Sequence, residues 1–121
     1  MEFIGIDNKN ALLLIAAQDL DSIIKILKFT VIELQYEYSA RTGFCESETE
    51  ALIKKLECAI GENKISITNQ EILNLRQNLV EVLFGIGNMD FDSQFNLSEK
   101  GVRALYEVID RTPNSFIFPP T

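Results

Sequence analysis

The first 112 residues contain no proline, because all three prolines, Pro113, Pro119 and Pro120, lie in the last nine residues. Proline lacks the amide hydrogen that a helix interior needs, so it interrupts helices. A stretch of this length without proline can therefore form long helices throughout. We expect a single mainly α domain over residues 1–121, with a proline-flanked tail from about 113.

The strongest helical pattern covers residues 19–41. Apolar side chains recur there at alternating spacings of four and three residues, which places them along one helical face: Leu20, Ile24, Leu27, Val31, Leu34 and Tyr38. Ile23, Ile26 and Phe29 widen this stripe, and a helix that is apolar over most of its girth is typical of a central position. We expect a bundle of four to five helices around this long central helix, with one or two short β-strands as an addition.

Polar residues mark the starts of three further helices. Ser47 and Glu50 match a capping box, in which each side chain bonds the backbone amide of the other residue. Thr68 and Glu71 match a second one, and Ser98 is a suitable cap for a last helix that reaches about residue 111. The expected helix stops are glycines: Gly61, and Gly85 or Gly87.

The first 18 residues allow two interpretations. The apolar runs FIGID and ALLLIAA lie on either side of a polar turn, which is the pattern of a β-hairpin. The second run is rich in alanine and leucine, which favours a short helix beginning near Asn8, and we expect the helix. The segment KISIT, residues 64–68, is either a short strand or an extended entry to the next helix.

The composition excludes several classes of function. The net charge is −7, with 18 acidic and 11 basic residues, so nucleic acids and anionic membrane surfaces are unfavourable partners. A basic protein surface is the natural electrostatic complement. There is no histidine and no glycine-rich phosphate loop, so Ser–His or Cys–His catalysis and most zinc sites are excluded. We expect no enzymatic activity and no cofactor.

The cysteines and the N-terminal sequence indicate a reducing, cytoplasmic location. Cys45 and Cys58 match no metal-binding spacing, and we expect both thiols to be free. The first residues, MEFIGIDNK, carry acidic side chains in place of the basic region of a signal peptide.

The segment NMDFDSQFNLSE, residues 88–99, resembles an EF-hand calcium loop. Counting from its first residue places oxygen-bearing side chains at positions 1, 3, 5, 7 and 12: Asn88, Asp90, Asp92, Gln94 and Glu99. Two departures oppose this interpretation. Position 1 is a neutral amide, and Ser93 occupies the sharp turn at position 6 that glycine normally fills.

A connector between two helices explains this segment better. Ser98 is placed to cap the last helix, and Glu99 lies favourably at the positive end of its dipole. Phe91, Phe95 and Leu97 would then anchor the connector to the core.

Acidic residues near exposed aromatic residues form the candidate partner-binding surface. Its members come from the long helix, the FCESETE segment and the connector: Glu33, Tyr36, Glu37, Phe44, Glu46, Glu48, Glu50, Asp90 and Asp92. Carboxylates around aromatic anchors suit a basic protein partner.

The small size, the acidity, and the lack of a leader and of catalytic residues resemble small acidic cytosolic immunity proteins of bacteria, including those paired with contact-dependent growth-inhibition toxins. The resemblance implies a protein that binds a toxin domain, often a basic nuclease, and blocks its active site. It carries over no site residue. The alternatives are a calcium-responsive binding protein that uses residues 88–99, and a homo-oligomeric scaffold subunit joined through the apolar cluster Phe116, Ile117 and Phe118.

Overall fold

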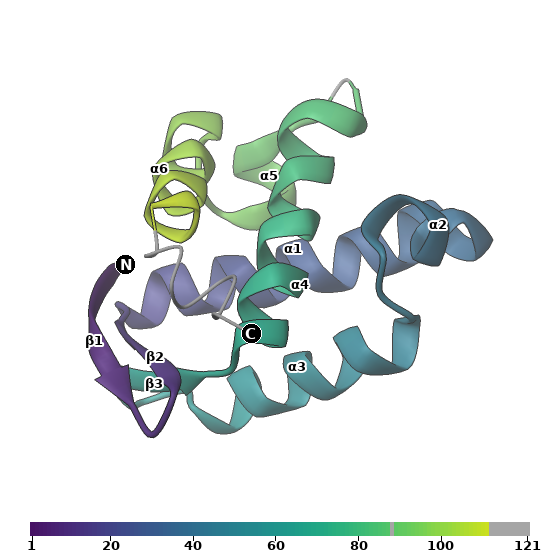
Figure 1. Cartoon of the computed structure of the whole chain (residues 1–121). Helices are drawn as coiled ribbons and strands as arrows, with labels where there is room; N and C mark the ends of the chain where they lie inside the picture. The colour runs from purple at the N-terminus through teal and green to yellow at the C-terminus, as the bar shows by residue number, and fades with distance from the viewer. Residues whose placement is uncertain (88, 112–121) are drawn as a thin grey trace.

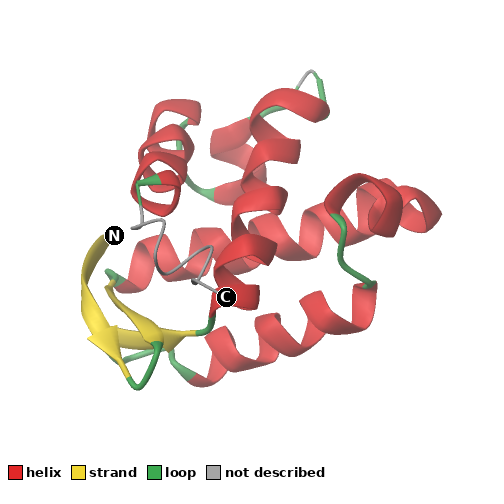
Figure 2. Cartoon of the chain, viewed as in Figure 1, coloured by secondary structure: helices red, strands yellow, loops and turns green. Residues whose placement is uncertain are grey.

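The chain begins with a β-hairpin, and most of the remainder is helical (Figure 1, Figure 2). The computed structural model describes residues 1–87 and 89–111. In chain order the elements are β1 (Glu2–Asp7), β2 (Asn10–Leu14), α1 (Ala17–Leu34), the 3-10 turn η1 (Gln35–Glu37), α2 (Tyr38–Thr42), α3 (Glu46–Cys58), β3 (Lys64–Ile67), α4 (Asn69–Val80), the π-helical turn η2 (Glu81–Gly85), α5 (Phe91–Phe95) and α6 (Glu99–Asp110). The mainly helical prediction is confirmed. The apolar cluster at residues 116–118 lies outside the described residues.

The first residues form a hairpin, so the helix expected near Asn8 is wrong. Asn8 and Lys9 both have positive φ, 50° and 69°, as the two-residue turn of a tight hairpin requires. β2 also pairs antiparallel with β3, which gives a three-stranded sheet in the order β1-β2-β3. Burial of Ala11 and Leu13 in the core explains why residues with helical preference lie in a strand.

The long helix expected over residues 19–41 is interrupted after Leu34. Gln35 has φ 50° and ψ −126°, and the chain continues as η1 and then α2. The apolar stripe is nevertheless buried on both sides of the break, because Leu27 and Tyr38 are both fully enclosed. The sequence contains no glycine or proline at this point, so nothing local indicates the break.

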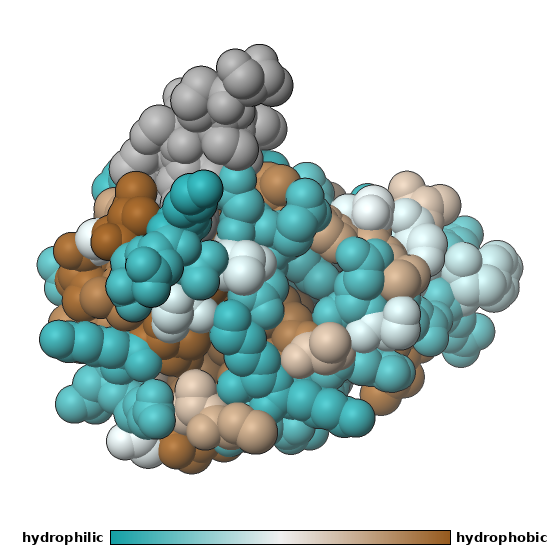
Figure 3. All heavy atoms as spheres, turned by 60° about the horizontal axis from the view of Figure 1, so that its bottom comes forward, coloured by the Kyte–Doolittle hydropathy of each residue, from teal (hydrophilic) through white to brown (hydrophobic). Residues whose placement is uncertain are grey.

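The helices pack on one another and on the sheet around a shared apolar core. α1 contacts α3, α4 and α5, while α6 packs against α4 and β1. In Figure 1, α3 lies below α1 and α5 lies above it. The face on which α3 lies is covered mainly by hydrophilic side chains, with hydrophobic patches between them (Figure 3).

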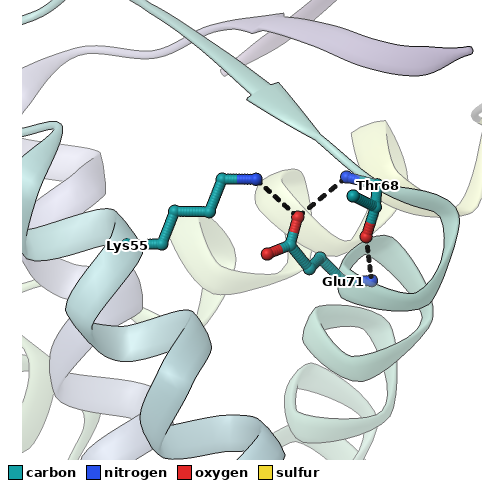
Figure 4. A network of polar contacts seen from close by, with 3 residues as sticks. All are labelled: Lys55, Thr68 and Glu71. Carbon is teal, nitrogen blue, oxygen red and sulfur yellow. Dashed lines mark hydrogen bonds and ion pairs between the residues drawn. The ribbon is translucent and has the colours of Figure 1, made fainter.

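Two of the three expected helix starts are confirmed. Thr68 Oγ1 accepts a hydrogen bond from the Glu71 amide at 3.2 Å, and Glu71 Oε1 accepts one from the Thr68 amide at 2.8 Å (Figure 4). Ser98 Oγ accepts from the Gly101 amide at 3.1 Å. Each bond satisfies an amide that the first helical turn leaves without an intrahelical partner.

The start of α3 differs from the prediction by two residues. Cys45, not Ser47, is the cap, and its backbone amide donates to Glu48 Oε1 at 3.0 Å. The carboxylate that completes the cap is therefore Glu48 and not Glu50. Cys45 and Glu48 have the same spacing as Ser47 and Glu50, and the earlier pair forms the cap.

Candidate protein-binding surface

One end of the molecule concentrates acidic side chains. It comprises the end of α1, then η1, α2 and the first turns of α3, which the chain links directly through residues 43–45. From residue 29 to residue 53 the chain has five acidic residues and one basic residue, Arg41. We call these five residues the acidic end: Glu33, Glu37, Glu46, Glu48 and Glu50.

The charges of the acidic end are not neutralised within the protein. Arg41 pairs with Glu81 on η2 at 2.6 Å, so its positive charge offsets the Glu81 carboxylate and not one of the acidic end. Within residues 1–87 and 89–111, no carboxylate of the acidic end forms an ion pair, whereas acidic side chains on neighbouring elements do, such as Glu57 with Lys28 and Glu71 with Lys55. These five carboxylates therefore contribute a negative field at this end of the molecule.

Exposed apolar side chains adjoin these carboxylates. Tyr36 in η1 is 89% exposed, and Ile32, in the last turn of α1, is 71% exposed. Phe44 is half-buried. Tyr36 and Ile32 lie in sequence beside Glu33 and Glu37, so apolar and acidic groups alternate along this edge of the protein.

The three glutamates of α3 do not share one direction. Glu46 and Glu50 are one turn apart and lie on one face of the helix, while Glu48 is on another. Hydrogen bonds from the Cys45 amide and thiol lower the pKa of the Glu48 carboxyl, which stays charged. Glu48 thus has a structural role at the helix start, and it also lines a small hollow of about 80 Å³ with Phe44, Gln70, Glu71 and Asn74.

A larger groove lies between α1 and α3. Its volume is about 300 Å³, and its lining is mainly apolar. We call it the α1–α3 groove, and its residues are Lys28, Val31, Ile32, Glu50, Ile53, Lys54 and Glu57. Glu50 belongs both to this groove and to the acidic end. The groove was not predicted from the sequence. One signal for it is present there, because Ile32 lies outside the apolar stripe of an otherwise well-patterned helix.

The two aspartates of the connector do not join the acidic end. Asp90 and Asp92 are exposed at α5, which contacts α1 on a different side from α3 (Figure 1). The expectation that they share one binding face with the glutamates of α3 has no support in this arrangement.

The connector has the features of a capped link between helices. Asp90 accepts a hydrogen bond from the Ser93 amide at 3.2 Å, and residues 91–95 form a helical turn. Phe91 and Phe95 are buried, as predicted. Of the proposed calcium ligands, Asn88 lies outside the described residues, Glu99 pairs with Arg103 at 3.8 Å, and Asp90 and Asp92 are exposed. Nowhere in the described ranges do three or more His, Cys, Asp or Glu residues group as metal ligands would.

A buried polar network fixes α2 and the start of α3 to the core. Asn78 Oδ1 accepts hydrogen bonds from the hydroxyls of Thr30 and Tyr38, the latter at 2.9 Å. The Asn78 amide nitrogen donates to the carbonyl and side-chain oxygens of Asn74, both at 2.8 Å. The Thr49 hydroxyl lies 2.6 Å from Tyr38 Oη. The network joins α1, α2, α3 and α4. A connected set of buried hydrogen bonds of this kind makes the structure beneath the acidic end rigid.

The backbone is strained at Gln35, directly before Tyr36, which is the most exposed aromatic residue of the described part of the chain. The angles of Gln35 are those of the first central residue of a type II′ turn, a position that glycine normally occupies. Such conformations persist where the surrounding structure enforces them, and they are frequent at functional sites. Gln35 lies between the end of α1 and the buried Tyr38, and the exposed Tyr36 follows it directly.

Comparisons with protein-family models, with curated proteins and with solved structures found no match for this chain. In the described part of the chain, no helix has both the length and the apolar character needed to cross a membrane.

Proposed function

We propose that this chain is a non-catalytic binding protein for a basic protein surface, and that it acts in the bacterial cytoplasm as an immunity protein that blocks a toxin domain. The observation that supports this proposal is the acidic end, with five carboxylates that form no ion pair in the described residues. Opposite charge accelerates encounter with a basic partner, and exposed apolar side chains at the same end supply contact area.

The arrangement of the helices suits this role. In this proposal α1 is the long central helix that supports the bundle, since it contacts α3, α4 and α5. It also carries Ile32 and Glu33 near its end. Inhibitors that bind by contact need little conformational change on binding, and the buried polar network supplies such rigidity.

Co-expression with the product of the neighbouring gene tests the proposal. We expect that product to contain a basic toxin domain, to stop growth when expressed alone, and to be tolerated when this protein is expressed with it. Isothermal titration with an active-site variant of the toxin should then give a 1:1 complex. Rescue without binding, or binding without rescue, would contradict the proposal.

A further inference from the structure

The α1–α3 groove has a shape and a lining that suit one class of ligand. Its floor is formed by Val31 and Ile53, and Ile32 stands at its rim with 71% of its surface exposed. No other large aliphatic side chain of the described residues is exposed to this extent. A groove between two packed helices offers side-chain contacts but no free backbone hydrogen-bonding groups, because helical backbones satisfy their own. It therefore suits a helix and not a β-strand.

The charged residues around the groove differ between its two ends. At one end, Lys28 on α1 and Glu57 on α3 form an ion pair at 3.0 Å that joins the two helices. Towards the start of α3, the groove leads through Glu50 to Glu46 and the rest of the acidic end. Lys54 is a basic group on the same side, and it forms no ion pair within the described ranges, so the groove itself is close to neutral. The other carboxylates of the acidic end lie beyond the end of the groove that is nearest the start of α3.

We propose that the α1–α3 groove binds the apolar face of an amphipathic helix of a basic protein, with the lysine or arginine residues of that helix over the acidic end. This inference rests on the proposed function and specifies how the partner is bound. A second copy of this chain is an unfavourable occupant, because it would bring its own acidic end against the first. A basic helix gains both apolar contact at Ile32 and charge complementarity at Glu50 and Glu46.

A designed peptide tests the inference without knowledge of the natural partner. The probe is a helical peptide of about 18 residues, long enough to be partly helical in water, with leucine on one face and arginine on the other. A matched peptide carries glutamate in place of arginine. Both are titrated into the ¹⁵N-labelled full chain and followed by amide chemical shifts. We expect saturable shifts at residues 28–32 and 50–57 with the arginine peptide, and binding at least about tenfold weaker with the glutamate peptide.

Two variants test whether the peptide binds at Ile32 in the groove. Ile32→Glu should weaken binding of the arginine peptide at least about tenfold, because it removes a large apolar contact and leaves a charge in the groove. Ile6→Glu is the matched control, since Ile6 is 56% exposed on β1, away from the groove, and it should leave binding unchanged. Both positions are exposed, so both variants should fold, and thermal unfolding verifies this.

Three results would overturn the inference. They are an absence of saturable shifts in the groove, shifts centred on another surface, and equal binding by wild type and Ile32→Glu. Sedimentation of the free protein adds a further criterion, because a dimer that Ile32→Glu dissociates would make a second copy the occupant. If the neighbouring gene product binds wild type and Ile32→Glu equally, the inference fails while the proposed function stands. If that product does not bind at all but the peptide does, the proposed function fails alone.

Discussion

Among the described residues with positive φ, Gln35 has the backbone conformation that suits a side chain least. With φ 50° and ψ −126° it occupies a region that glycine reaches without steric cost. The Gln35→Gly variant should therefore raise the free energy of unfolding by about 1 kcal/mol. Urea denaturation measures this change. As a control, Gln77→Gly, the same substitution inside α4, should lower it by about 1 kcal/mol. If both variants are destabilised, Gln35 does not have the strained conformation described above.

Tyr38 joins two other residues in the buried network, Thr49 and Asn78. Its hydroxyl donates to Asn78 and lies against Thr49, so Tyr38→Phe removes two buried hydrogen bonds, although Asn78 keeps its bond to Thr30 and Thr49 its bond to Asn74. We expect a loss of about 1–3 kcal/mol in the free energy of unfolding. Tyr106→Phe, at a half-buried site on α6, should cost less. Equal losses in the two variants would show that the network contributes nothing specific.

Tyr38 also gives the stability a dependence on alkaline pH. Burial raises the pKa of its phenol, although the hydrogen bonds that it forms with Thr49 and Asn78 partly oppose the rise. Above about pH 10 the unfolded chain can lose this proton while the folded chain retains it. The stability contribution is therefore complete below that pH and is lost as the pH rises through the folded-state pKa. The unfolding free energy of wild type should decrease more steeply above pH 10 than that of Tyr38→Phe.

At the scale of elements, Glu71 links α3 and α4. Its carboxylate completes the capping box of α4 and also pairs with Lys55 on α3 at 2.6 Å (Figure 4). Burial acts to raise the pKa of this carboxyl, but hydrogen bonds from Lys55 and the Thr68 amide outweigh it, and the pKa is lowered overall. Its contribution is thus present above the unfolded-state pKa and is lost as the pH falls through the folded-state pKa.

Two substitutions separate the roles of Glu71. Glu71→Gln retains an acceptor for the Thr68 amide and loses only the ion pair, which should cost at most about 1 kcal/mol. Glu71→Ala loses both and should cost about 1–2 kcal/mol. Thermal or urea unfolding at neutral pH compares them. The account is contradicted if Glu71→Gln is the more destabilised of the two.

The hairpin turn provides a test of the N-terminal element. Lys9 has φ 69°, so Lys9→Gly creates the Asn-Gly pair that type I′ turns prefer. The variant should be more stable by about 0.5–1 kcal/mol. In the alternative helix near Asn8, the same change would cost about 1 kcal/mol, so the sign of the difference distinguishes the two structures.

Local signals predicted some of these elements, and tertiary contacts decided the others. The caps at Thr68 and Ser98 were predictable, because a helix start is specified within four residues. The hairpin was not predictable in this way, because its turn lacks glycine and the alanine and leucine of β2 favour a helix. Pairing with β3 and burial in the core stabilise the strand instead. The break at Gln35 was not predictable, because no glycine or proline marks it and the apolar stripe continues through it.

At the scale of the whole molecule, the distribution of charge matters more than its total. The net charge of −7 was evident from the sequence, and so were the glutamates on α1, η1 and α3. It was not evident from the sequence that these glutamates form no ion pair in the described residues. This depends on the pairing of Arg41 with Glu81, 40 positions further along the chain. The sequence could likewise not place Asp90 and Asp92 on another side of α1, or bring Ile32 to the edge of a groove.

The salt dependence of association with the neighbouring gene product tests the central claim most directly. Stopped-flow mixing at increasing ionic strength should show a steep fall in the association rate for wild type, because screening weakens electrostatic steering. A variant with Glu33, Glu37, Glu46 and Glu50 all replaced by glutamine should associate about tenfold or more slowly at low salt, with a much weaker salt dependence. If this variant and wild type show the same rates and the same salt dependence, the acidic end is not the surface that meets the partner.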